Sequence, residues 1–429
     1  MNINLFMRLG VRFFLLQVGT VLSQLSGHVC RLSLAWWCLK ETHSAITFST
    51  LIAFSVAAEI YLKPFIATLG DVYNRIKLIV LCQLAVLIII FMFCVISLVG
   101  SFNITIVGIG LITMSSILSL REPTITGLIP DLVEDGEISR AIAYRSAVGS
   151  FVMLLGPVLA ALIISLYSAG VALYVSVVLQ SLSCVAFIII SKKEGVVMSV
   201  ITNEDGLLSK IKDGFYAIYH VKPEYYLALI SAIINFTMFP FFSVTVPYWI
   251  STELQLPASY LGAFELSFSI GLIAGSINLN ALAGMLVGRF LNVLAGFLLL
   301  GGSVIGIVMA PSIYVSIAFA FFSGLAFIFI NVNLSSLRVS ATPRHYRTRM
   351  SAMASFISSM ANPFGLVIAG WCTHRYGVTP FAVFSGGIVI LVSPILLWLP
   401  KLKIILSLTE GEMRGYYEKE YPEAFNRIK

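Results

Sequence analysis

The feature that most constrains this chain is a succession of apolar runs, each about 20 residues long, separated by short polar segments. The hydrocarbon core of a bilayer is about 30 Å thick, so an α-helix needs about 20 mainly apolar residues to cross it. Twelve runs meet this requirement, at 13–38, 46–69, 77–99, 103–127, 141–167, 171–191, 226–250, 257–281, 290–310, 313–337, 350–372 and 379–399. We therefore predict an all-α integral membrane protein with twelve transmembrane helices.

The composition supports this prediction. The 429 residues are 59% hydrophobic and only 11% charged, whereas about a quarter of the residues in a soluble domain are charged. Tryptophans gather at the ends of the predicted spans, as in an aromatic belt. They are Trp36, Trp37, Trp249, Trp371 and Trp398. All six cysteines lie within spans and form no CxxC motif, so we predict no metal or redox site.

The distribution of basic residues predicts the orientation. Only Lys40 and Arg375 of the 27 Lys and Arg residues fall in outer loops if the N-terminus is inside, and Arg31, Lys63 and Arg121 lie within spans. The remainder are counted as inner, which is the pattern that fixes membrane topology. We expect both termini to be cytoplasmic. The net charge of +7 is then explained by topology, and no nucleic-acid partner is expected.

The longest polar interval, 192–225, divides the chain into two halves of six spans each. We predict an N-terminal half at 1–191, a cytoplasmic linker at 192–225, a C-terminal half at 226–399 and a cytoplasmic tail at 400–429. The linker sequence LLSKIKDGFYAIYHV predicts an amphipathic helix on the inner membrane surface. Its expected apolar face is formed by Leu208, Ile211, Phe215, Ile218 and Tyr219. The tail is charged and contains no recognisable motif.

The two halves repeat one another in sequence. GDVYNR after the second span aligns with GMLVGR after the eighth, 214 residues later. The segment from Pro130 through Gly156-Pro157 similarly parallels the segment from Pro343 through Asn362-Pro363. Parallel repeats of this kind are typical of transporters whose halves rock against each other.

Polar residues inside the spans are the strongest functional signal. A charged side chain at the bilayer centre costs roughly 2.5–3.5 kcal/mol on insertion scales, so such residues normally face the bundle interior or a wet cavity. Polar residues recur every three or four positions in the first span, within a sector of about 60°. They are Gln17, Thr20, Gln24, His28 and Arg31. A second stripe in the fourth span consists of Ser115, Ser119, Glu122 and Thr126.

Other ionisable residues lie outside these stripes. Arg121 points about 100° away from Glu122, so the two residues need not share a partner. Glu59 and Lys63 have the spacing of an intrahelical ion pair, and we favour a structural or gating role for them. Glu265 has no charged neighbour in sequence, which makes it a candidate protonatable site.

Several motifs resemble those of a known family. Pro64 followed by GDVYNRIK resembles the loop signature of the major facilitator superfamily, although Ala67, Val72 and Asn74 depart from its usual form. The segment PTITGLIPDLVEDGEISRAIAYRSAVGSFVMLLGPVLAALI, at 123–163, resembles the branch that contains enterobactin exporters and macrolide-efflux proteins. IKDGFYAIYH, VTVPYWI and TPRHYRTRMSAM point to the same branch. The resemblance implies the major facilitator fold, with two six-helix pseudo-repeats.

The resemblance also implies roles for individual residues. In the superfamily the first, fourth, seventh and tenth spans line a central cavity, where cargo or protons would bind. The candidates for this role are Gln24, His28, Arg31, Arg121, Glu122, Asn235, Glu265 and Asn331. An alternative interpretation is that the charged residues of the N-terminal half only pack its helices together.

Gating residues follow from the same resemblance. Asp71 is expected to dock at the start of the eleventh span, and Arg75 is expected to bond neighbouring loops. Gly149 and Gly156-Pro157 look like a reduced form of an antiporter motif, with Ala160 and Ala161 in place of its final glycines. The gating candidates are Asp71, Arg75, Glu59, Gly156, Pro157, Arg347 and Arg349.

These observations favour a secondary active transporter that exports a small amphipathic molecule, a siderophore or drug-like compound, by proton antiport with alternating access. Import of a metal–siderophore complex or another nutrient is the alternative within transport, and a non-transporting sensor that recruits a partner through its tail is the alternative outside it. No nucleotide-binding loop, G-x-S-x-G elbow or HExxH helix is present. We therefore expect no enzymatic activity and no cofactor or metal, with a proton gradient as the energy source. We expect a monomer in the bacterial inner membrane.

Overall fold

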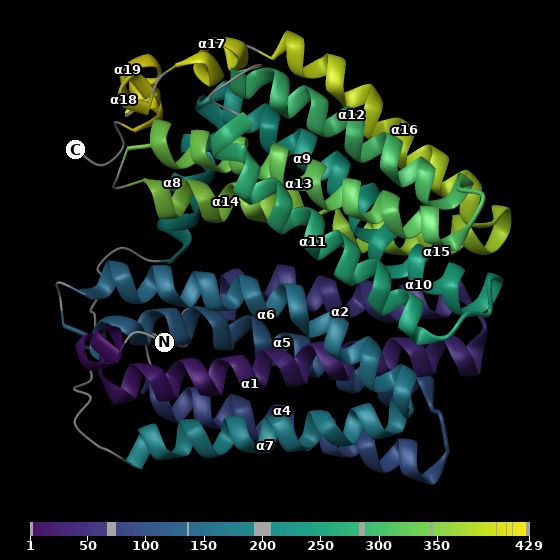
Figure 1. Cartoon of the computed structure of the whole chain (residues 1–429). Helices are drawn as coiled ribbons and strands as arrows, with labels where there is room; N and C mark the ends of the chain where they lie inside the picture. Colours follow the sequence, from purple (N-terminus) through teal and green to yellow (C-terminus); the bar gives the residue numbers. More distant parts are fainter. Residues whose placement is uncertain are drawn as a thin grey trace. The chain divides into compact units, whose positions relative to one another are not determined.

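The computed structural model describes the chain except residues 1–2, 67–73, 135–136, 193–206, 283–287, 344–345, 400, 409, 414 and 426–429. Twelve helices in the described part are long and apolar enough to cross a membrane, so the predicted number of spans is confirmed. The chain divides into two compact units, one formed by 1–202 and 247–262, the other by 203–246 and 263–429. Figure 1 shows the helices with their labels.

Six long helices belong to the first unit. They are α1 (Ile3–Thr42), α2 (Ala45–Ile66), α4 (Arg75–Val99), α5 (Ile104–Leu128), α6 (Ile138–Leu166) and α7 (Ala169–Lys192). Helix α1 packs against α6 and α7, while α4 packs against α5 and α7. At one end of this unit a cluster of fully buried apolar side chains includes Phe13, Leu16, Ile79, Ile125 and Phe187. This cluster fixes the mutual positions of α1, α4, α5 and α7.

Local sequence signals explain where these helices begin and end. Helix α4 ends at Gly100, whose φ of 72° is left-handed and favours glycine. Helix α5 begins after Asn103, whose side-chain oxygen accepts hydrogen bonds from the backbone nitrogens of Thr105 and Ile106 at 3.0 and 3.2 Å. This N-cap satisfies two of the four free N–H groups at a helix start. The turn between α4 and α5 can therefore be short.

The remaining long helices belong to the second unit except for residues 247–262, which belong to the first. They are α9 (Lys222–Pro240), α11 (Ala258–Leu282), α12 (Gly288–Met309), α13 (Ile313–Ala341), α14 (Arg347–Ser359), α15 (Asn362–Tyr376) and α16 (Val378–Ile395). Helix α9 continues through η3 (Phe241–Thr245), α10 (Val246–Tyr248) and η4 (Trp249–Glu253). Helix α12 packs against both α13 and α16, and α9 packs against α14 and α15.

Two glycines permit a close crossing of α11 and α13. A Cβ atom added to Gly271 would lie 2.0 Å from the Phe321 carbonyl oxygen, and one added to Gly324 would lie 2.0 Å from the Phe268 carbonyl oxygen. The two helix backbones therefore touch at a distance that only glycine allows. Small residues at helix interfaces are a common device in membrane bundles because they let backbones approach closely.

Two elements differ from the sequence prediction. The predicted eleventh span is formed by α14 and α15, which are separated at Met360 and Ala361, just before Pro363. Proline removes a helical hydrogen bond and clashes with the preceding turn, which accounts for the break. The predicted seventh span is longer than expected and contains the π-helical turns η3 and η4.

The predicted amphipathic helix is present as α8 (Leu207–His220), and only part of its apolar face packs against the protein. Ile218 is buried as expected, whereas Phe215 and Tyr219 are half exposed. Gly214 faces the backbone of Arg349, where an added Cβ would lie 3.1 Å from the carbonyl oxygen. Helix α8 therefore packs against α14 through its small residues and leaves two aromatic side chains outward.

The C-terminal tail, residues 400–429, is folded in its described part. It forms α17 (Leu402–Ser407), α18 (Glu410–Met413), α19 (Tyr416–Glu420) and η6 (Pro422–Ala424). These short helices pack against α12, α13 and α8 of the second unit, at the end where Figure 1 labels α17, α18 and α19. The sequence contains no motif that predicts this docking.

Candidate functional site

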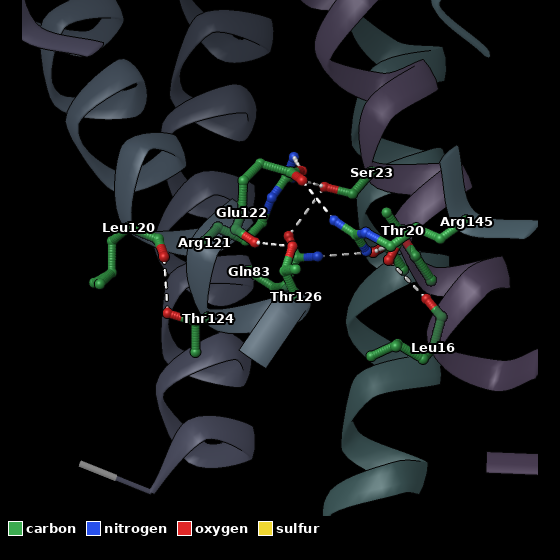
Figure 2. A network of polar contacts seen from close by, with 12 residues as sticks. Leu16, Thr20, Ser23, Gln83, Leu120, Arg121, Glu122, Thr124, Thr126 and Arg145 are labelled. Atoms are coloured by element: carbon green, nitrogen blue, oxygen red, sulfur yellow. Dashed lines mark hydrogen bonds and ion pairs between the residues drawn. The ribbon is translucent and has the colours of Figure 1, made fainter. Parts of the chain in front are cut away.

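A network of buried polar side chains joins the helices of the first unit (Figure 2). Ser23 on α1 lies at its centre, with Oγ 3.1 Å from Oε1 of both Gln83 on α4 and Gln180 on α7. Gln180 donates to Gln83 Oε1 at 2.8 Å, and Gln83 donates to Ser183 Oγ at 3.2 Å. Arg121 on α5 donates to Ser23 Oγ. Because buried polar groups must be satisfied internally in lipid, this network fixes the register of four helices.

An ion cluster of Arg121, Glu122 and Arg145 adjoins the network. Arg121 Nη2 lies 2.9 Å from Glu122 Oε1, and Arg145 Nη2 on α6 lies 2.6 Å from Glu122 Oε2. The side chains of the two arginines are 6% and 13% exposed, compared with 35% for that of Glu122. Glu122 therefore holds two guanidinium groups and is also the most accessible member of the cluster.

The ion cluster borders a cavity of about 180 Å³ between α1, α5 and α6. Its lining residues are Gln17, Thr20, Val21, Gln24, Glu122, Arg145, Ser146, Val148 and Gly149. Three members of the predicted α1 stripe, Gln17, Thr20 and Gln24, thus share this space with Glu122. No side chain of the described part lies within 4 Å of a Cβ added to Gly149, so this position leaves room in the cavity.

Two donors at the cavity lack a partner. Gln17 is 4% exposed, and its Nε2 atom has no hydrogen bond; Arg145 Nη1 is likewise buried and unpaired. An unsatisfied buried donor costs about 1–3 kcal/mol. The ion cluster also has two cations for one anion. The cavity is therefore suited to a group that accepts hydrogen bonds and tolerates positive charge.

His28 and Arg31, the other two members of the α1 stripe, do not line this cavity. His28 packs on α6, where a Cβ added to Gly156 would lie 2.6 Å from His28 Cδ2. Glycine at 156 is therefore needed for the imidazole to fit. Arg31 is exposed, and no ion pair within the described residues includes it.

Arg121 and Glu122, whose pairing the sequence left open, form a contact, whereas Glu59 and Lys63 do not. Arg121 and Glu122 do share a contact, because the long arginine side chain reaches back around the helix to its neighbour. By contrast, the described side chains of Glu59 and Lys63 form no ion pair in the structure, so the spacing alone was not sufficient. Both residues lie on α2, away from the cavity lining.

Among the gating candidates, Arg75 is anchored at the start of α4. Its Nη1 donates to the Gly127 carbonyl at 2.7 Å and lies 3.5 Å from Asp131 Oδ2. Asp71 lies outside the described residues. Pro157 lies inside α6, next to the glycine that accommodates His28.

The candidates of the C-terminal half are dispersed. Asn235 on α9 donates to the Ser358 carbonyl on α14 at 3.0 Å, which is a helix–helix contact. Asn331 is exposed and donates to the Phe327 carbonyl of its own helix at 3.1 Å. Glu265 on α11 is partly buried, and the ion pairs of the described residues do not include it.

Two arginines near the start of α14 make local contacts. Arg347 Nε donates to the Thr342 carbonyl at 3.3 Å. Arg349 Nη1 lies 3.6 Å from Asp213 Oδ2 on α8, and its guanidinium stacks over the Tyr346 ring at 5.7 Å. These contacts tie α14 to α8 and to the loop before α14.

Three important residues were missed by the sequence argument. Arg145 was counted among the inner-loop cations, whereas it lies in the part of α6, Arg140–Leu166, that is long and apolar enough to cross a membrane. Gln83 and Gln180 are neutral, and nothing in the sequence predicts that residues 97 positions apart bond each other. Their presence in otherwise apolar runs was the available signal, because an amide in hydrocarbon needs a partner.

Among the described residues, no group of three or more His, Cys, Asp or Glu side chains could hold a metal ion. Twelve membrane-crossing helices, folded as two units, and a buried ion cluster beside a small cavity define the chain as a multi-pass helical membrane protein of the transporter class. The chain belongs to the Major Facilitator Superfamily, whose family model matches residues 17–359.

Similar proteins agree with this assignment. Macrolide efflux protein A of Streptococcus pyogenes is 21% identical over 392 residues, covering 89% of this chain and 94% of the relative. The resemblance to the macrolide-efflux branch is thereby confirmed. Crystal structures of the nucleoside transporter NupG and of the peptide transporter POT with sulfate have TM-scores of 0.69 and 0.70 at 11% and 13% identity. The match with NupG covers 90% of this chain and 99% of NupG, and the match with POT covers 92% of this chain and 94% of POT.

Proposed function

We propose that this transporter exports a small amphipathic molecule, a siderophore or drug-like compound, by proton antiport with alternating access. The observation that carries the proposal is Glu122, a partly exposed carboxylate that pairs with two arginines at the edge of a cavity. The efflux activity named for the Streptococcus pyogenes relative supports export.

Glu122 is suited to the exchange of a proton. While ionised, it neutralises one of the two guanidinium charges beside it. Protonation removes that charge and releases both arginines, so that Arg145 is no longer held beside the cavity and proton and cargo compete. Binding at the cavity is thereby linked to the protonation state of one residue. One proton that crosses 100 mV contributes about 2.3 kcal/mol.

The polar end of the cargo is proposed to bind the unpaired donors. Gln17 Nε2 and Arg145 Nη1 both lack acceptors and belong to residues that line the cavity. Carbonyl, phenolate and carboxylate oxygens would satisfy them, whereas an ammonium group would meet like charge. A siderophore, rich in oxygen acceptors, fits this requirement. We further propose a monomer in the bacterial inner membrane with both termini cytoplasmic.

Import of an anionic nutrient or metal–siderophore complex together with a proton is a second candidate. It is favoured by the excess of cations in the ion cluster. An anion that pairs with Arg145 would displace Glu122 and promote its protonation, so that anion and proton bind together. In antiport, binding of the cargo must instead favour release of the proton, because cargo and proton compete for the site.

The test is a measurement of binding and of proton exchange on purified protein. The probes are a macrolide antibiotic, a catecholate siderophore and the ferric complex of that siderophore. A bound probe raises the unfolding temperature because ligand binding stabilises the folded state. In weakly buffered solution, proton release on binding supports antiport and proton uptake supports import with a proton.

Variants assign the effect to the site. Glu122→Gln should abolish proton exchange, and Gln17→Leu should weaken binding by about tenfold, the effect of losing about 1.4 kcal/mol. Ser150→Ala is the matched control, because the Ser150 hydroxyl bonds only the Ser146 carbonyl of its own helix. Unchanged proton exchange in Glu122→Gln would show that another group couples transport.

A further inference from the structure

We propose that the C-terminal tail is a reversible clamp, in which Tyr417 positions the buried ion pair between α9 and α13 and so holds the ends of these two helices together. Besides Leu406, which is 2% exposed, five of the tail's described side chains are at most 1% exposed although the segment is rich in charge. They are Leu402, Ile405, Met413, Tyr417 and Ala424. A tail that served only as a soluble extension would not bury these residues.

The first anchor is a three-residue contact centred on Glu224. This residue lies in the first turn of α9 and is 0% exposed. Arg338 Nε at the end of α13 donates to Glu224 Oε2 at 2.8 Å, and the Tyr417 hydroxyl donates to Glu224 Oε1 at 3.1 Å. Tyr417 is itself 0% exposed. One carboxylate thus joins the start of α9, the end of α13 and the tail.

Two further anchors lie along the tail. The Gly415 nitrogen donates to the Ser340 carbonyl on α13 at 3.3 Å. The ring of Phe425 packs edge-on against that of Tyr346, with centroids 5.1 Å apart. Tyr346 in turn carries the stacked Arg349 that pairs with Asp213. The tail therefore contacts the helix ends at one point and the loop before α14 at another.

The clamp is expected to dock and release as a unit. Its helices α17, α18 and α19 contain six, four and five residues, whereas an isolated helix needs at least about 12 to be marginally stable in water. The tail helices therefore owe their structure to docking. When the contacts break, the segment unfolds, so intermediate positions are not populated.

Release of the tail changes the environment of the Glu224–Arg338 pair. A buried carboxylate that loses one of its donors is left with unsatisfied oxygen lone pairs, and water must then enter. Between the described residues of α9 and α13 there is no other hydrogen bond or ion pair. Tail release should therefore loosen the two helix ends, which gives the tail control over how easily they separate.

The test is hydrogen–deuterium exchange of the full chain in nanodiscs, followed by mass spectrometry. Tyr417→Phe removes only the hydroxyl, and Tyr416→Phe is the matched control on the neighbouring residue. We expect Tyr417→Phe to raise exchange about tenfold in the tail and in peptides covering 222–228 and 334–342. The control should behave as the unmodified chain does.

Phe425→Ala distinguishes release of a clamp from local damage. Phe425 packs on Tyr346 and not on the Glu224 contact, so its loss affects the helix ends only through the tail as a whole. Faster exchange at 222–228 and 334–342 in this variant, with protection retained elsewhere, supports the proposal. Exchange that rises only around Tyr346, or helix ends that stay protected in Tyr417→Phe, would overturn it.

Discussion

Arg145 Nη2 lies 2.6 Å from Glu122 Oε2, a contact between α6 and α5 that joins residues 23 positions apart in sequence. Arg121 occupies the other oxygen of the same carboxylate at 2.9 Å. Glu122 is therefore bound on both sides, and either arginine can change partner without leaving the carboxylate free. The net charge beside the cavity therefore depends on whether Glu122 is ionised.

Replacement of Glu122 by glutamine should destabilise the first unit. The amide keeps the shape but leaves two arginine charges without an anion, and the cost should be about 1–3 kcal/mol because Glu122 is partly exposed. Glu122→Gln combined with Arg145→Gln should recover part of the loss. Thermal unfolding of the four proteins of this double-mutant cycle measures the coupling. Additive effects would contradict the observed contact.

The amide network predicts a second effect on stability. Gln180→Leu leaves Gln83 Oε1 and Ser23 Oγ without their partner on α7, which should cost about 1–3 kcal/mol. Ser181→Ala is the control, because its hydroxyl bonds only the Val177 carbonyl of α7 itself. The unfolding temperature in detergent should fall in the first variant and remain within about one degree in the second.

The crossing of α11 and α13 predicts that the loss of stability on a Gly→Ala substitution depends strongly on which glycine is replaced. Gly271→Ala and Gly324→Ala each place a methyl group 2.0 Å from a carbonyl oxygen of the facing helix, so both should destabilise the second unit by more than about 3 kcal/mol. Gly302→Ala is the matched control, since nothing lies within 4 Å of its added Cβ. It should be neutral or stabilising by up to about 1 kcal/mol. Equal effects at all three positions would argue against the crossing.

Tail docking should weaken at high pH. Burial, together with the adjacent Glu224 carboxylate, raises the pKa of Tyr417 well above its ordinary value. The folded tail keeps this proton while the released tail loses it near pH 10, so docking is unaffected below about pH 10 and weakens above it. Each further pH unit should reduce docking by about 1.4 kcal/mol, until the pKa of the docked phenol is reached.

Limited proteolysis of the tail between pH 9 and 11 measures this dependence. The unmodified chain and Tyr416→Phe should become more susceptible as the pH rises past 10, whereas Tyr417→Phe should be cleaved readily at pH 9 and show a flatter profile. Parallel profiles for all three proteins would show that the Tyr417 hydroxyl does not govern docking.

Much of the fold could be predicted because the bilayer dictates it. A helix that crosses hydrocarbon must be long and apolar, and that requirement alone gave twelve spans, all of them present. The polar stripe of α1 was also informative, since Gln17, Thr20 and Gln24 line the cavity with Glu122. Periodicity identifies the face of a helix, and these residues share one face.

The remainder depended on geometry that periodicity does not contain. The angle of Arg121 around the helix axis describes only the direction of its Cβ atom. The guanidinium lies several bonds further out and reaches Glu122. Arg145 lies in the first turns of its helix. At such positions, a functional arginine cannot be distinguished by sequence from the basic residues that determine membrane orientation. Tyr417 and Phe425 sit among charged residues, and their burial follows only from contacts with distant helices.

The amide network of the first unit also bears on how the protein is made. Gln83 enters the membrane 97 residues before Gln180, its partner in the finished structure. Until α7 is synthesised, Gln83 lacks its partners Gln180 and Ser183, and an amide with missing partners is unfavourable in lipid. The last helix of this unit therefore completes the polar network, because it supplies the acceptor and the donor that Gln83 lacks until then.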